Sequence, residues 1–145
     1  MTEIRSGELK QLLQDWQGWR GKRAFPSRAD FDPMNLKYIL GSLSLIDVIG
    51  SPPQFRIRLH ASNVVDRGGV DLTGKLIDEM QTDRREIARA HYLEALKKRA
   101  PVVRNYVDQN VDERLWNCEV LVLPLASDGT AIDMLMSAFV WTDKG

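Results

Sequence analysis

The residue types that most often carry chemistry are sparse in this sequence. There are two histidines, His60 and His91, and one cysteine, Cys118, and their spacing matches no metal-binding motif. No serine lies in the glycine pattern of a nucleophile elbow, and no glycines have the spacing of a phosphate-binding loop. We therefore predict neither a catalytic site nor a metal site, and we expect that the protein is not an enzyme.

The densest local signal is the loop Pro26-Ser27-Arg28-Ala29-Asp30-Phe31-Asp32-Pro33. Asp32 before Pro33 predicts a helix start, since aspartate caps helices and proline suits the first helical position. We expect that helix to run to about residue 40. Arg28 lies close to Asp30 and Asp32 in the sequence, which indicates either a structural anchor or an anion site on Arg28. We prefer the anchor, because such ion pairs are mostly architectural.

A second set of residues suits a small-molecule cavity, because aromatic side chains with a few polar groups line such pockets. They belong to the predicted long helix and the late strands. They are Tyr92, Arg104, Tyr106, Trp116 and Met136. Ordinary core packing is the competing interpretation. The sequence also leaves open which face of the late strands is the inner one.

The composition predicts a globular domain. A chain of 145 residues is long enough for one core without disulfides, and its 20 basic and 20 acidic residues balance. That balance argues against nucleic-acid binding through Arg56, Arg58 and Arg104. There is no signal-peptide core and no apolar run of about 20 residues. With one cysteine, we expect a cytoplasmic protein with no membrane or nucleic-acid partner.

An amphipathic helix is predicted at residues 6–21, followed by a connector. Its apolar positions recur at helical spacing. They are Leu9, Leu12, Leu13, Trp16 and Trp19. Such a stripe must be covered, either by the sheet of the same chain or by a second chain.

The rest of the chain predicts an α+β domain. Strands at 42–49 and 55–60 form a hairpin across the turn at 50–53. Helical turns at 62–67 and 76–80 precede a long helix at 83–99, with Ile87, Ala90, Leu93 and Leu96 facing inward. Three strands follow at 101–108, 115–125 and 131–142. The last two are apolar on both faces, so we expect both faces of the sheet centre to be covered.

This order of elements, and four motifs in it, resemble the short bacterial PAS-like family. That family is typified by a PSRADIDP loop, a YRL strand end, a DLTG loop and a late LPL strand. The matching stretches are residues 26–33, Phe55-Arg56-Ile57-Arg58-Leu59, Asp71-Leu72-Thr73-Gly74-Lys75 and Leu123-Pro124-Leu125-Ala126. The resemblance covers about residues 16–141. One departure is His60-Ala61-Ser62, where the family usually has a small residue, glycine and threonine.

The resemblance implies a PAS fold: a five-stranded antiparallel sheet with helices on one face, plus the N-terminal amphipathic helix. We expect a single domain over residues 1–145, with the helix at 6–21 and the PAS core at 26–142. The implied function is non-enzymatic sensing in signal transduction, through small-molecule binding, protein–protein interaction or both. It further implies a homodimer through the N-terminal helix and a signalling protein partner whose identity stays open.

The cofactor is left open by the resemblance, and neither haem nor flavin is predicted. Some PAS domains carry a haem-ligating histidine on the long helix, where His91 lies, but the surrounding residues do not match that pattern. Flavin-adduct domains place their cysteine in an asparagine-rich motif before the long helix, whereas Cys118 lies in a late strand. A small buried thiol is the expectation for Cys118.

An alternative is a small enzyme or ligand-binding protein on a cone-shaped, isomerase-like α+β fold. That fold places most of its helix before the sheet, whereas a PAS fold inserts helices between the second and third strands.

Overall fold

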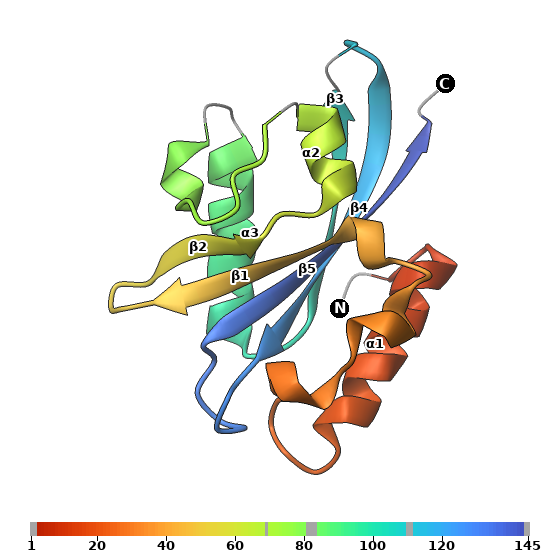
Figure 1. Ribbon diagram of the computed structural model, residues 1–145. Helices are drawn as coiled ribbons and strands as arrows, with labels where there is room; N and C mark the ends of the chain where they lie inside the picture. Colours follow the sequence, from red (N-terminus) through yellow and green to blue (C-terminus); the bar gives the residue numbers. More distant parts are fainter. Residues whose placement is uncertain (1–2, 69, 81–83, 110–111, 144–145) are drawn as a thin grey trace.

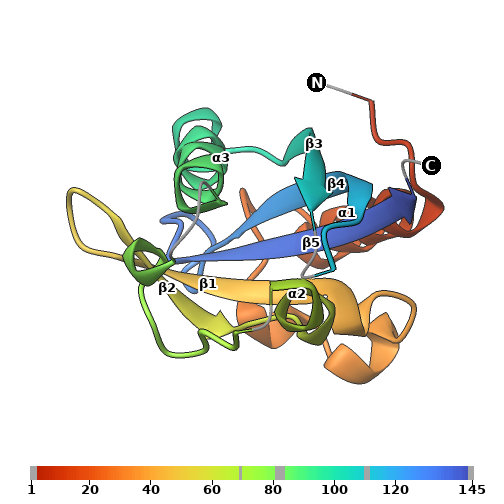
Figure 2. The ribbon, with the colours of Figure 1, turned by 90° about the horizontal axis from the view of Figure 1, so that it is seen from above.

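The centre of the protein is one antiparallel sheet of five strands, in the order β2-β1-β5-β4-β3 (Figures 1 and 2). The computed structural model describes residues 3–68, 70–80, 84–109 and 112–143. Pairing is antiparallel throughout, which confirms the predicted fold class. The strands are β1 (Leu43–Ile49), β2 (Gln54–Leu59), β3 (Val102–Gln109), β4 (Leu115–Leu125) and β5 (Met134–Asp143).

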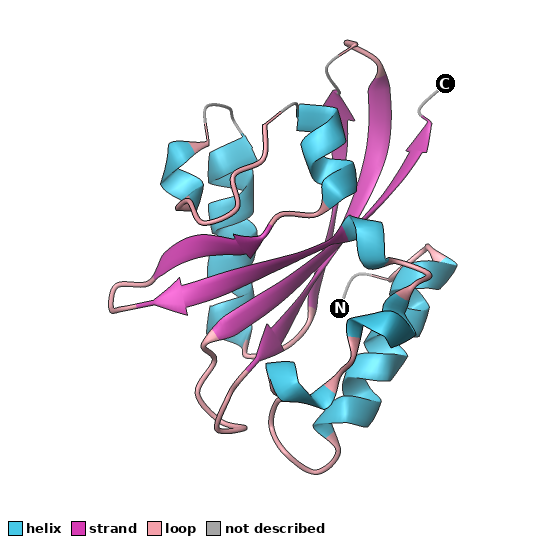
Figure 3. Ribbon diagram, viewed as in Figure 1, coloured by secondary structure: helices cyan, strands magenta, loops and turns pink. Residues whose placement is uncertain are grey.

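Helices cover both faces of this sheet (Figures 1 and 3). On one face lie α2 (Ser62–Gly68), the 3₁₀ turn η4 (Ile77–Glu79) and α3 (Arg84–Lys98). On the other lies α1 (Gly7–Arg20) with the turns η1 (Arg28–Asp30), η2 (Pro33–Leu36) and η3 (Leu40–Ser42). Because α2, η4 and α3 are inserted between β2 and β3, the fold is not the isomerase-like alternative.

The two central apolar strands contribute to two separate hydrophobic cores. Alternate side chains of β4 point to opposite faces, as strand geometry requires. Leu121, Leu123 and Leu125 pack in the core under α1, whereas Cys118, Val120 and Val122 pack in the core under α3. Both faces of the sheet centre are therefore covered, as the sequence predicts.

The stripe of α1 is covered by the sheet of the same chain. Leu9 and Leu12 are completely buried and Trp16 is 4% exposed, while Leu13 and Trp19 pack partly buried against the same core. The indole Nε1 of Trp16 donates a hydrogen bond to the carbonyl of Pro124 on β4 (2.8 Å). The apolar residues from which the sequence predicts a dimer helix are thus packed against the sheet of the same chain.

A buried carboxylate on β4 holds the start of α1. Glu119, 7% exposed, accepts hydrogen bonds from the backbone N–H groups of Arg5 (2.7 Å) and Ser6 (2.9 Å). The Ser6 hydroxyl in turn accepts from the N–H of Leu9 (3.1 Å) and caps the helix. Gly21, with a positive φ of 58° that glycine adopts readily, ends it.

Two expected details of the helices are wrong. The inner face of α3 carries His91, Tyr92 and Ala95, whereas Ile87 and Leu93 are each 41% exposed. The prediction considered only apolar residues, but the side chains of α3 that face the sheet include the imidazole of His91 and the phenol of Tyr92. Near residue 33, Asp32 does cap a helical turn by accepting from the N–H of Met34 (2.9 Å). That turn, η2, ends at Leu36, and Gly41 lies inside η3.

Replacing Glu119 by Gln should lower the free energy of unfolding by about 1–3 kcal/mol, because the amide offers one oxygen for two buried N–H donors. Urea unfolding measures this, and amide hydrogen exchange should show faster exchange in the first turn of α1. Glu3→Gln is the matched control, since Glu3 is exposed. Equal stability of the two variants would contradict the docking role of Glu119.

Candidate functional site

A cavity of about 130 Å³ lies between the inner face of the sheet and helices α2 and α3. Its strand wall is mainly apolar, with Ile46, Ile57, Val120 and Phe139. Polar groups from both helices and the sheet interrupt this wall. They are Ser44, His60, Arg67, Arg84, His91, Tyr92, Tyr106, Asp108 and Ser137. An apolar pocket with a few converging polar groups is the usual form of a small-molecule site.

His91 of α3 is fixed in one tautomer. Its Nε2 lies 2.9 Å from the carbonyl oxygen of Val102, which can only accept, so Nε2 carries the proton. Its Nδ1 then accepts from the hydroxyl of Tyr106 (3.2 Å). Burial lowers the pKa of His91, as does the nearby Arg104, while the Val102 carbonyl and Glu94 act in the opposite direction. The imidazole is therefore neutral and held at both nitrogens.

Other titratable groups of the cavity are also held neutral by burial. Burial raises the pKa of Tyr92 to about 12, against the effect of the neighbouring Ser137 hydroxyl. Burial likewise raises the pKa of Tyr106 to about 12 and that of Cys118 to about 12. Because the thiolate is the reactive form of cysteine, Cys118 behaves as a small buried thiol.

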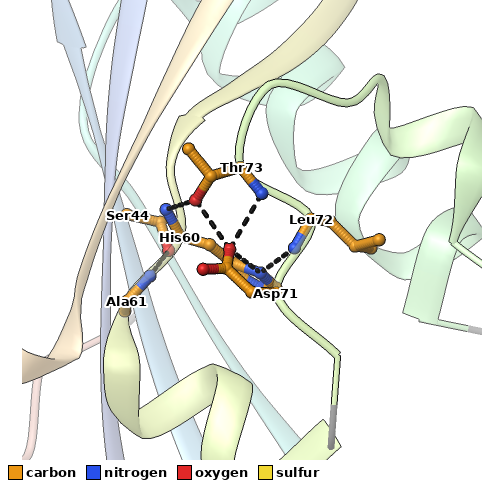
Figure 4. A network of polar contacts seen from close by, with 6 residues as sticks. All are labelled: Ser44, His60, Ala61, Asp71, Leu72 and Thr73. Carbon is orange, nitrogen blue, oxygen red and sulfur yellow. Dashed lines mark hydrogen bonds and ion pairs between the residues drawn. The ribbon is translucent and has the colours of Figure 1, made fainter.

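His60, the departure from the family motif, ties the end of β2 to the loop at 71–74 (Figure 4). The Nδ1 atom of its ring accepts from the backbone N–H of Leu72 (3.1 Å), and the backbone N–H of His60 donates to the hydroxyl of Thr73 (3.2 Å). That hydroxyl donates to Asp71 (2.7 Å). Burial lowers the pKa of His60, and Asp71, 4.0 Å away, acts in the opposite direction. His60, which lines the cavity, is thus held in place by the motif loop.

The charged residues lie toward the outer ends of β4 and β5. Arg84 of α3 donates to Asp108 of β3 (2.9 Å), and Asp108 also accepts from the indole of Trp141 (3.3 Å). Arg67 of α2 contacts two tryptophans, with its guanidinium carbon 4.5 Å from the ring centre of Trp116 and 4.2 Å from that of Trp141. Arg67, Trp141 and Phe139 are cavity residues that the sequence analysis did not single out.

Of the five residues predicted for the cavity, the structure brings together only some. Tyr92 and Tyr106 line it, whereas Trp116 does not line it but contacts Arg67, which does. Met136 does not: it is completely buried in the core under α1. Arg104 does not line the cavity either, and its side chain pairs with Glu94 of α3. Strand alternation explains Met136, since the cavity face of β5 is the one that carries Ser137, Phe139 and Trp141.

The predicted structural anchor at residues 28–32 is formed by a different ion pair. Asp30 pairs with Arg23 (2.8 Å), not with Arg28, and it accepts from the N–H of Ser27 (2.6 Å). That backbone hydrogen bond is the main reason why the pKa of Asp30 is lowered. Arg28 instead donates to the carbonyl of Phe31 (3.3 Å) and lies 4.6 Å over its ring. Since Phe31 packs in the α1 core, this loop lies on the sheet face opposite the cavity.

Comparison with known families decides the classification. A family model described as PAS domain matches residues 4–139. The chain belongs to the PAS domain family. The family is one of sensory signalling domains, and the order of elements given above is the one that the resemblance implied. No curated protein matches the chain.

Solved PAS structures share the fold at low identity. A light-oxygen-voltage domain described with a flavin analogue is 11% identical, with a TM-score of 0.52 over 71% of this chain and 78% of that one. A sensory box sensor histidine kinase from Vibrio cholerae is 16% identical, with a TM-score of 0.52 over 70% and 82%. The light-oxygen-voltage protein from Rhodobacter sphaeroides is 17% identical, with a TM-score of 0.50 over 72% and 60%. At such identities the likeness concerns the fold alone.

The cavity of this PAS domain does not fit a flavin or a haem. Its volume of about 130 Å³ is below the roughly 300–1,000 Å³ of sites for drug-sized ligands. Its cysteine lies on β4 with a protonated thiol, and both nitrogens of His91 are engaged. Within the described ranges, no three His, Cys, Asp or Glu side chains are grouped to hold a metal. None of the helices described has the length and apolarity to cross a membrane.

The buried histidines predict acid sensitivity. Because their pKa values are lowered in the fold, the unfolded chain binds more protons below about pH 6.5, and the free energy of unfolding should fall as pH drops. Each histidine contributes at most about 1.4 kcal/mol per pH unit. Urea unfolding at pH 7.5 and 5.5 should show a smaller decrease for His91→Gln than for the wild type. An unchanged decrease would contradict the assignment of neutral, buried His91.

Proposed function

We propose that this PAS domain is a non-enzymatic sensor that binds a small molecule in the cavity between the sheet and helices α2 and α3. The observation that carries the proposal is the cavity itself, which is lined by side chains from five strands and both helices. A close-packed core would leave no such space, since protein interiors have few voids larger than a water molecule. A bound ligand would therefore lie against the sheet and against both helices.

The size of the cavity sets the size of the ligand. An apolar cavity of about 150 Å³ binds benzene, so a cavity of about 130 Å³ suits a molecule of similar size. The Tyr92 hydroxyl and the Arg67 guanidinium supply polar contacts at separate points of the wall. Such groups orient a ligand, while the apolar strand residues provide most of its affinity.

The state of the polar groups supports binding rather than catalysis. The Nδ1 atoms of His60 and His91 already accept hydrogen bonds from protein groups, so neither imidazole offers a free basic nitrogen to a substrate. The Cys118 thiol is protonated because burial raises its pKa to about 12. These side chains hold the walls of the cavity in place, which suits a receptor.

Cavity filling tests this proposal. Ala88 of α3 lines the cavity, and leucine is a good helix former, so Ala88→Leu should occupy part of the space without unfolding the helix. In a thermal-shift screen of molecules of about five to ten heavy atoms, the wild type should show a rise in Tm with some of them. The Ala88→Leu variant should lose that rise.

The matched control is Ala90→Leu, because Ala90 is exposed on the same helix. It should keep the rise in Tm of the wild type. Native mass spectrometry of the purified protein adds a direct readout of retained ligand. An equal rise in Tm in all three proteins would count against a cavity receptor. So would the combination of no rise in Tm with any molecule of the screen and no ligand retained in the purified protein.

The proposal also includes a signalling protein partner and a homodimer, as dimerisation is common among PAS domains. The stripe of α1 cannot supply this contact without leaving its own sheet, because Leu9 and Leu12 are completely buried. A dimer would therefore use the outer surface of the domain. Sedimentation velocity of the full chain should show a concentration-dependent dimer in the micromolar range. A monomer at every concentration would exclude the homodimer and leave the signalling partner as the remaining output.

A further inference from the structure

Arg67 of α2 is held in an unusual position for an arginine. Its guanidinium carbon lies 4.5 Å from the ring centre of Trp116 and 4.2 Å from that of Trp141. Such contacts use the faces of the planar group and leave its edge, which carries the N–H donors, to form hydrogen bonds. The side chain lines the cavity, and it also lines a neighbouring pocket with Asn63 and Asp66. A molecule in the cavity is therefore within reach of it.

One donor atom of that group lacks an acceptor in the part of the chain that the structure describes. The Nη1 atom of Arg67 is buried and makes no hydrogen bond there, and neither does the indole Nε1 of Trp116, whose ring Arg67 contacts. Asp108, the carboxylate among the lining residues of the cavity, is already bonded to Arg84 and Trp141. A buried donor left without an acceptor is costly. Two such donors on residues in contact therefore point to a ligand that brings an acceptor.

We propose that the cavity binds a small monocarboxylate, with its carboxylate on the edge of Arg67 and its apolar body against Ile46, Ile57 and Phe139. The inference rests on the proposed function, since it names the ligand class of the same cavity. The guanidinium edge matches the geometry of a carboxylate, with two parallel hydrogen bonds. The indole Nε1 of Trp116, on the ring that Arg67 contacts, is a further buried donor without an acceptor among the described residues.

The charges of the wall favour a monoanion over a dianion or a neutral ligand. Arg84 is already paired with Asp108 (2.9 Å), and His60 and His91 are neutral, so Arg67 is the cation left for a ligand among the described wall residues. One negative charge would be matched, whereas a second would be buried without a partner. A neutral ligand would leave the Arg67 charge unmatched.

Isothermal titration calorimetry at pH 7.5 tests this with matched acids and amides. The probes are isovalerate and benzoate, and their isosteric controls are isovaleramide and benzamide. The acids should bind the wild type at least about tenfold more tightly than the amides. Arg67→Gln should weaken binding of the acids by about ten- to a hundredfold, the loss of a charge-assisted pair, while changing amide binding little. Tryptophan emission should respond to the acids, because Trp116 and Trp141 flank Arg67.

Two further variants keep the outcome interpretable. Arg58→Gln removes an arginine that pairs with Asp47 on the surface, and it should bind the acids as the wild type does. Arg67→Lys keeps the charge but loses the planar fork, and it should fall between the wild type and Arg67→Gln. Urea unfolding confirms that each variant is folded.

The calorimetry distinguishes a wrong ligand class from a cavity that binds none of these ligands. If acids and amides bind equally well and Arg67→Gln binds both as the wild type does, the monocarboxylate is overturned and the cavity receptor stands. If neither acids nor amides bind the folded wild type at millimolar concentration, the monocarboxylate is overturned and the receptor proposal loses its best ligand. The acid–amide comparison uses the wild type alone, so it decides even if Arg67→Gln does not fold.

Discussion

The structure depends on the burial of both faces of the central strands β4 and β5. Leu121 and Leu123 lie under α1 while Val120 and Val122 lie under α3, so neither face can be exposed to water without losing a core. Burial of each large apolar side chain contributes about 1.5–3 kcal/mol, and these strands contribute such side chains to both cores. The chain therefore needs a cover on each side, and it supplies one from before the sheet and one from between β2 and β3.

The two covers pack differently, and this difference places the site. Under α1 the contact is apolar except for two sets of hydrogen bonds. Glu119 accepts from backbone N–H groups at the helix start, and Trp16 Nε1 donates to the carbonyl of Pro124. Under α2 and α3 the facing groups are an imidazole, phenols and an arginine, which pack with a cavity of about 130 Å³. Polar side chains with fixed hydrogen bonds cannot collapse into such a space as methylene groups would. The cavity is thus a consequence of which residues face the sheet.

Much of the fold could be predicted from the sequence, and less of the site. The strand at 115–125 and its double burial follow from apolar residues at both odd and even positions of the strand, and the helix start at Ser6 follows from local capping chemistry. The inner face of α3 could not be found by counting apolar residues, because His91 and Tyr92 occupy it. Met136 was misplaced because β5 is apolar on both faces, so its alternation gives no sign of which face is inner. Arg67 and Trp141 meet only in three dimensions, and no local pattern marks such a pair.

The position of Arg67 relates the proposed ligand site to the opposite side of the sheet. Trp116, on which Arg67 stacks, and Glu119, which holds the start of α1, lie three residues apart on β4. Odd spacing along a strand puts their side chains on opposite faces. A ligand that engages Arg67, as proposed, would therefore lie beside the strand that anchors α1. Because β4 contributes side chains to both cores, it is the element that the proposed ligand site and the outer helix share.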